Sequence, residues 1–206
     1  MGHHNDKIEI IILSSKIAYF MDVKEFFEQC AGKWFSQRTS HYLDFRPAKS
    51  GKSDIFVETL STDTPEVIKL CQEHDINPEV ALFGLRYRWE GTIEGKKEKN
   101  IGSTLIVPVP HVDKPNQGLL LQERGNSGKS STVGHYILSE DGALTMTAED
   151  KNIYSEERIW FASPNLKLRS GIIKRSGRST QASISSEIRM GLTQPPKKTE
   201  DTAVSN

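Results

Sequence analysis

The sequence predicts an all-β protein, built as a barrel or a sandwich. Short runs in which apolar and polar residues alternate recur along the chain, and the clearest one runs from Phe83 to Ile93. Turn residues separate these runs, and Asp141-Gly142 between two of them is typical of a two-residue hairpin. About ten runs at this spacing are typical of a barrel or sandwich of antiparallel strands.

One or two short helices accompany the strands. Apolar residues recur at helical spacing from Val23 to Cys30, and Gly32 is suited to end a helix that plugs or covers a barrel. A second helix is expected over Pro65 to His74, because proline is favoured in the first helical turn and apolar residues follow on one face. We expect this second helix to pack against the barrel.

The strands are expected between these helices and after them. The first two are joined by a predicted turn at Lys49-Ser50-Gly51-Lys52. The expected strands cover residues 34–45, 55–60, 83–93, 101–109, 117–123, 132–138, 143–147, 152–162, 165–173 and 180–190.

Length and composition favour one domain over residues 21–191. Residues 1–20 are interpreted as an extension that is not native or not ordered, with Met21 as a candidate natural start, and 192–206 as a disordered tail. The 27 basic and 27 acidic residues balance, so no global charge favours nucleic acid or an anionic membrane. Two cysteines and no signal or membrane-spanning segment predict a soluble, intracellular protein.

Several catalytic and binding motifs are excluded by their spacing. The segment from Gly125 to Ser130 resembles a phosphate-binding loop. The motif requires a glycine at position 123, where this chain has Glu123, and no helix is expected to follow the loop. The histidines show no metal-ligand spacing, so no metal site is expected. No Gly-x-Ser-x-Gly motif is present, and acyl transfer is not supported.

One acidic residue is expected inside the barrel. Glu157 shares a strand face with Ile153, Ile159 and Phe161, and if this face lines the barrel its carboxylate points inward. A buried carboxylate must be paired, protonated or used. The residues leave two interpretations equally open, namely an internal ion pair with Arg38 or Arg169 and a contact with a ligand.

Two segments closely resemble one known family. They are Gly-Lys-Trp-Phe-Ser-Gln-Arg-Thr-Ser-His at 32–41 and Glu-Arg-Ile-Trp-Phe-Ala-Ser-Pro-Asn-Leu at 157–166. They resemble the S-type phycobilin lyases of cyanobacteria, red algae and cryptophytes, over residues 21–190. The resemblance implies a lipocalin-like, ten-stranded antiparallel β-barrel, similar to fatty-acid-binding proteins. It also implies an enzyme that binds a linear tetrapyrrole and attaches it through a thioether to a cysteine of a phycobiliprotein subunit.

The resemblance also implies a set of site residues. A bilin needs cations for its two propionates, a carboxylate for its pyrrole nitrogens and aromatic walls for its conjugated faces. Glu157 and Arg169 are the expected catalytic residues. Lysine at 167 departs from an expected arginine; it keeps the positive charge but lacks the bidentate fork that arginine offers a propionate. The expected bilin-binding residues are Arg38, Trp89, Tyr87, Trp34, Lys167 and Glu187.

Partners and location follow from the same resemblance. Phycocyanobilin or phycoerythrobilin is expected as a transient substrate rather than a permanent cofactor, and the second partner is an apo-phycobiliprotein subunit. A homodimer, or a heterodimer with a related lyase, is possible. The expected location is the cytoplasm of a cyanobacterium, or the plastid stroma of an alga. The alternatives are a lipocalin-like bilin carrier without attachment activity, and one subunit of a heterodimeric lyase.

Overall fold

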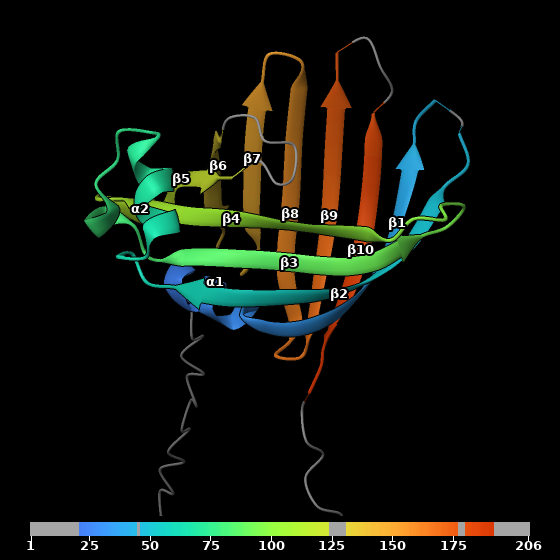
Figure 1. Ribbon diagram of the computed structural model, residues 1–206, viewed down its shortest axis with the longest axis horizontal. Helices are drawn as coiled ribbons and strands as arrows, with labels where there is room; N and C mark the ends of the chain where they lie inside the picture. Colours follow the sequence, from blue (N-terminus) through green and yellow to red (C-terminus); the bar gives the residue numbers. More distant parts are fainter. Residues whose placement is uncertain (1–20, 45, 124–130, 177–179, 192–206) are drawn as a thin grey trace, which may run out of the picture.

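Ten antiparallel strands close into a single barrel in the computed structural model (Figure 1), which describes residues 21–44, 46–123, 131–176 and 180–191. Each strand pairs with its neighbours in sequence, and β1 pairs with β10 to close the sheet. Closure leaves no strand edge unpaired. The strands are β1 (Gly32–Tyr42), β2 (Lys49–Leu60), β3 (Gly84–Ile93), β4 (Asn100–His111), β5 (Lys114–Gln122), β6 (Thr132–Leu138), β7 (Leu144–Asp150), β8 (Ile153–Ser163), β9 (Leu166–Arg175) and β10 (Gln181–Arg189).

Helix α1 (Val23–Cys30) plugs one end of the barrel (Figure 1). It begins with a capping box, in which Asp22 and Glu25 each accept a hydrogen bond from the other's backbone N–H. Phe26 and Phe27 are fully buried, and they pack edge-on against Phe161 and Tyr136 of the barrel wall. The expected plug is confirmed.

The carbonyl groups at the end of α1 are bonded to the barrel. Arg189 donates to the carbonyls of Gln29 at 2.6 Å and Ala31 at 2.7 Å, and the Trp34 indole donates to Cys30 at 2.9 Å. These bonds satisfy acceptors that a helix end leaves without partners. They fix the plug to both β1 and β10.

Helix α2 (Pro65–Gln72) lies outside the barrel, against β4 and β5 (Figure 1). Its buried side chains Val67 and Leu70 form a second core with outward residues of these strands, among them Leu105, Val107 and Leu121. The prediction of a second helix packed on the barrel is therefore confirmed. A one-turn 3-10 helix, η1 (Pro78–Val80), follows it. No helix among the described residues is long and apolar enough to cross a membrane.

Two turn predictions are wrong. The segment Lys49-Ser50-Gly51-Lys52 is the start of β2, paired with β1, because small residues there line the barrel interior. The connection after β6 is not a two-residue hairpin. Its turn spans Ser139 to Gly142, with a hydrogen bond from the Gly142 N–H to the Ser139 carbonyl and Gly142 at φ 75°.

The remaining boundaries differ by a few residues. The first strand ends at Tyr42 rather than at residue 45, and the second helix ends at Gln72 rather than at His74. The excluded phosphate-loop segment, the proposed extension and the proposed tail all lie outside the described residues.

Candidate functional site: a charged cavity inside the barrel

A cavity of about 640 Å³ occupies the half of the barrel that α1 does not fill. Residues of all ten strands line it, and its rim is formed at the end where β1 joins β2 and β3 joins β4. The volume lies within the range of roughly 300–1,000 Å³ that small-molecule sites occupy. The barrel is therefore a container that is open at one end.

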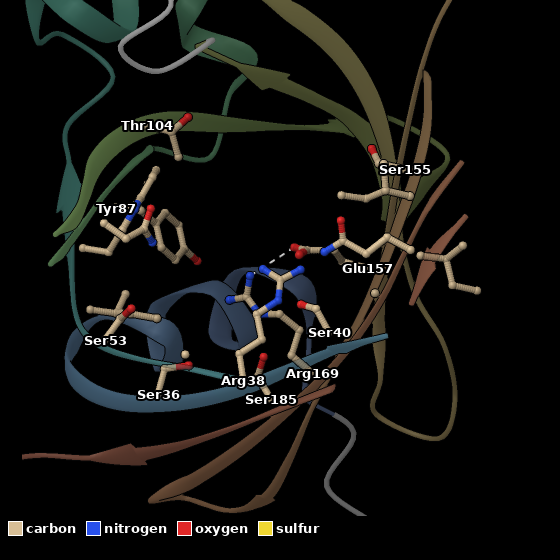
Figure 2. A pocket seen from close by; sticks show the side chains of 18 of the residues that line it. Ser36, Arg38, Ser40, Ser53, Tyr87, Thr104, Ser155, Glu157, Arg169 and Ser185 are labelled. Carbon is tan, nitrogen blue, oxygen red and sulfur yellow. Dashed lines mark hydrogen bonds and ion pairs between the residues drawn. The ribbon is translucent and has the colours of Figure 1, made fainter. Parts of the chain in front are cut away.

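Small inward side chains create this space. Inward positions alternate along each strand, and in this half of the barrel many of them carry serine or glycine. Figure 2 shows such serines around the cavity, projecting from strands on different sides of the barrel. The serines are Ser36, Ser40, Ser53, Ser155 and Ser185, and with Gly51, Gly134 and Gly171 they leave the interior unfilled.

Glu157 and Arg169 form an ion pair inside the cavity (Figure 2), with Arg169 Nη1 3.0 Å from Glu157 Oε2. Arg169 Nε also lies 3.3 Å from Glu187 Oε1. Burial alone would lower the pKa of Arg169, but the carboxylates of Glu187 and Glu157 more than offset this and hold its pKa above the ordinary value. Arg169 is therefore a fixed cation between two carboxylates, and Glu157 points inward as predicted.

Arg38 projects into the same cavity (Figure 2) without a carboxylate partner among the described residues. Its Nη2 donates to the hydroxyl of Ser183 at 2.8 Å, and its buried Nε meets no described acceptor. A buried guanidinium N–H that lacks an acceptor is costly in a protein without a ligand. Of the predicted cations, Arg38 is the one available to an anionic ligand.

Lys167 and Trp34 do not reach the cavity wall. Lys167 is fully buried, its Nζ lies 2.8 Å from Glu187 Oε2, and it also lies over the Trp34 ring at 4.4 Å. Trp34 itself is fully buried, and Arg189 covers it at 4.2 Å. Both residues lie below the cavity, beside α1, so the expected direct contacts of Trp34 and Lys167 with a bilin have no geometric support.

Glu187 connects this buried layer to the cavity. It lines the cavity while its carboxylate contacts Lys167 and Arg169. Burial alone would raise the pKa of Glu187, but Arg169 and Lys167 more than offset burial and lower its pKa below the usual value. Glu187 is therefore an ionised carboxylate that holds Arg169 in place.

Two aromatic residues of β3 belong to the apolar part of the wall. Tyr87 and Trp89 both line the cavity, as predicted. The Trp89 indole lies over Gly102 of β4, where a Cβ atom would come within 2.2 Å of the ring. The Tyr87 hydroxyl lies near the Cys30 thiol at the end of the plug, and burial raises the pKa of both groups. Burial therefore favours the protonated form of the Cys30 thiol.

The residues at the rim of the cavity and its serine lining were not among the site residues predicted from the sequence. Tyr42, Lys49 and Lys96 line the cavity at its open end. Serine and glycine at alternate positions of the first strands were a signal for the lining, because an inward position that carries no bulk cannot belong to a filled core. The rim residues lie where strands end, so strand alternation gives no signal for them.

A family model described as CpeS-like protein matches residues 22–190 of this chain. The chain belongs to the CpeS-like family. A protein of Thermosynechococcus vestitus named chromophore lyase CpcS/CpeS is 51% identical over 175 residues, covering 85% of this chain and 96% of that protein. A protein of Picosynechococcus sp. named phycocyanobilin lyase subunit CpcS is 42% identical over 160 residues, covering 77% and 81%.

A solved structure agrees with the fold of this CpeS-like protein. The S-type phycobiliprotein lyase CPES from Guillardia theta matches with a TM-score of 0.76 and 32% identity, covering 84% of this chain and 95% of that chain. The predicted ten-stranded barrel and the predicted family are therefore confirmed. The roles of individual site residues stay predictions.

Proposed function

We propose that this CpeS-like protein is a chromophore lyase that holds a linear tetrapyrrole in its barrel and attaches it through a thioether to a cysteine of a phycobiliprotein subunit. The lyase class follows from the family. The bilin, either phycocyanobilin or phycoerythrobilin, is a transient substrate rather than a resident cofactor.

The observation that carries this proposal is the excess of positive charge inside the barrel. Arg38 and Arg169 line the cavity and Lys167 lies buried beneath it, and the carboxylates that pair with these cations are those of Glu157 and Glu187. Arg38 has no carboxylate partner among the described residues. A ligand that brings carboxylates into this interior would complete the charge balance. A bilin has two propionates, and its flat conjugated faces match the Tyr87 and Trp89 wall.

The attachment reaction needs no nucleophile from this chain. The acceptor thiol adds across the exocyclic ethylidene double bond of the bilin, so a carbon–sulfur bond forms and the thiol proton ends on the tetrapyrrole. Nothing leaves and no oxidant is required. Glu157 accepts hydrogen bonds from the pyrrole N–H groups and stabilises a protonated bilin, which makes the ethylidene carbon more electrophilic. Arg169 positions Glu157 at 3.0 Å.

Incubation of the protein with a free bilin and an apo-phycobiliprotein subunit tests the proposal. We expect faster formation of covalent adduct than in the spontaneous reaction, with a single absorption band for the product. Adduct is measured by bilin fluorescence on a denaturing gel. An adduct yield equal to the spontaneous reaction, with the bilin nevertheless bound, would support the alternative of a carrier.

A matched pair of variants tests the role of the Glu157 carboxylate in attachment. Glu157→Gln removes the charge inside the cavity, whereas Glu58→Gln removes an exposed carboxylate on the outside of β2 that pairs with Arg88. We expect Glu157→Gln to slow attachment about 100-fold or more and Glu58→Gln to leave it unchanged. Equal rates for both variants would remove Glu157 from the mechanism.

A further inference from the structure

Two lysines at the rim of the cavity have no carboxylate partner among the described residues. Lys49 begins β2 at an inward position, Lys96 lies in the connection between β3 and β4, and both line the open end of the cavity. The nearby Lys99, by contrast, pairs with Glu90 on the outside of the barrel. The rim therefore adds two cations to a cavity that already holds Arg38.

The two rim lysines lie on the same side of the barrel as Arg38. In the register of β1 and β2, Lys49 lies two residues closer to the mouth than Arg38. At a rise of about 3.3 Å per residue, this step is roughly 7 Å. The connection that carries Lys96 is bound to the same place, because the Glu94 N–H donates to the Ser50 carbonyl at 2.8 Å. Arg38 and the rim lysines thus form a row of cations from the interior of the cavity to its mouth.

The carboxylate of Glu157 lies on another side of the cavity. Its strand, β8, is four strands from β2 around the ten-stranded barrel, and Figure 2 shows Glu157 on the other side of the cavity from Ser53 of β2. A linear tetrapyrrole has the same two-sided layout. When it curls, its pyrrole nitrogens face inward along one edge, and its two propionates extend from the two central rings, B and C, on the other edge. A bilin whose nitrogens face Glu157 therefore directs both propionates toward the row of cations.

We propose that Lys49 and Lys96 bind the propionate of ring B of the bilin, while Arg38 binds the propionate of ring C. This inference rests on the proposed function and adds to it the orientation of the substrate. Propionates on neighbouring rings need two cationic positions a few ångströms apart, and the step of roughly 7 Å between Arg38 and Lys49 supplies them. Arg169 is not the second anchor, because Glu157 and Glu187 already pair with it.

Access by the acceptor decides which propionate lies at the rim. The ethylidene group that reacts belongs to ring A, at one end of the tetrapyrrole and next to ring B. The thiol that attacks it comes from another protein, and helix α1 closes the far end of the barrel. Ring A must therefore lie at the open end, which places the ring B propionate beside Lys49 and Lys96 and the ring C propionate beside Arg38.

Bilins esterified on one propionate test this orientation, in absorption titrations without an acceptor. The double variant Lys49→Gln with Lys96→Gln should bind the free diacid about tenfold more weakly than wild type, but should bind the ring B monomethyl ester as wild type does. Arg38→Gln should weaken binding of the ring B ester and leave binding of the ring C ester unchanged. The matched control is Lys52→Gln with Lys97→Gln, which removes the same charge from exposed lysines that do not line the cavity. It should bind each bilin as wild type does.

Circular dichroism of each variant checks that the barrel has folded. Equal affinities of the rim double variant and its control for the diacid overturn the proposal. So does a ring B ester that binds the rim variant more weakly than wild type, because ring C would then lie at the rim. Unchanged bilin affinity together with a higher acceptor concentration for half-maximal attachment would assign the rim lysines to the acceptor subunit and also overturn it. These outcomes leave the lyase proposal intact, whereas a wild-type chain that binds no bilin would overturn the proposed function itself.

Discussion

Lys167 differs from the other interior cations in its depth. It is fully buried, paired with Glu187 at 2.8 Å and in contact with the Trp34 ring. Breaking a buried ion pair from one side leaves an uncompensated charge. The lysine therefore stabilises the barrel and keeps Glu187 ionised below the cavity.

Removing the Lys167 charge should destabilise the protein. Lys167→Met leaves Glu187 with Arg169 alone, and we expect a loss of about 2–4 kcal/mol in the free energy of unfolding, measured by urea denaturation. Lys167→Arg should recover most of this loss because it keeps the charge. A stability equal to wild type in Lys167→Met would show that the pair adds nothing.

Arg38 is expected to act on ligand binding more than on stability. It forms no ion pair with a described residue, so Arg38→Gln should change the unfolding free energy little. Loss of a charge-assisted bond to a propionate should weaken bilin affinity about tenfold to 100-fold, measured by absorption titration. Arg88→Gln on the outer surface is the matched control. Equal affinities for both variants would contradict the assignment of Arg38 as the anchor.

The carboxylate of Glu187 gives stability a defined pH dependence. Its pKa in the folded protein lies below the ordinary 4.5, so the unfolded chain binds its proton first as the pH falls. The contribution of Glu187 to the free energy of unfolding is therefore complete above pH 4.5. It is lost as the pH falls through the lower pKa that Glu187 has in the folded protein. We expect the stability gap between wild type and Glu187→Gln to stay constant from about pH 7 to about pH 5 and to shrink as the pH falls further, to about pH 3, in urea denaturation. A gap that stays constant below pH 4.5 as well would exclude this linkage.

The sequence predicts which residues point inward but not how deep they lie. Two-residue alternation correctly puts Lys167, Arg169 and Glu157 on inward faces. Depth along the strand depends on where α1 ends and the cavity begins, and this is set by long-range packing of Phe26 and Phe27 on the wall. Alternation therefore could not separate Lys167, which lies below the cavity, from Arg169, which lines it.

At the scale of elements, the cavity wall and a loop have similar compositions. The start of β2 was expected to be a turn because it contains Ser50, Gly51 and two lysines. In the structure these residues are a strand, and Gly51 faces the cavity opposite Arg38. A barrel that must stay empty needs small inward residues, and small polar residues are also what turns contain.

The junction between α1 and β1 depends on one glycine. Gly32 has φ 116°, and a Cβ atom there would lie 2.9 Å from the Arg189 guanidinium that binds the end of α1. Gly95 also has a positive φ, of 76°, but nothing lies near its Cβ position.

Alanine at these two glycines should therefore have unequal effects. Gly95→Ala should cost about 1 kcal/mol from backbone strain alone, whereas Gly32→Ala should cost roughly 2–4 kcal/mol because it also displaces Arg189 from the carbonyls of α1. Thermal unfolding followed by circular dichroism measures both. Similar losses would mean that Arg189 does not anchor the plug.

At the scale of the whole molecule, the two halves of the barrel interior serve different needs. The half beside α1 is filled by residues such as Phe27, Leu85, Tyr136 and Leu144, which are all fully buried. The other half forgoes this packing and keeps a cavity lined by serines. An unfilled interior lacks the packing contacts that stabilise a core. The cavity therefore lowers stability, and it is useful only to a protein that binds a ligand inside the barrel.

A larger side chain inside the cavity should weaken ligand binding without lowering the free energy of unfolding. Ser53 lines the cavity from β2, and Ser53→Leu adds an apolar side chain where the bilin would lie. We expect unfolding free energy equal to wild type or higher by up to about 1 kcal/mol, together with at least a tenfold loss of bilin affinity in an absorption titration. Ser103→Leu, at an outward position of β4 opposite Arg88, is the control and should keep wild-type affinity. If Ser53→Leu bound a bilin as tightly as the control, the ligand would have to lie outside the barrel, and the proposed site would be wrong.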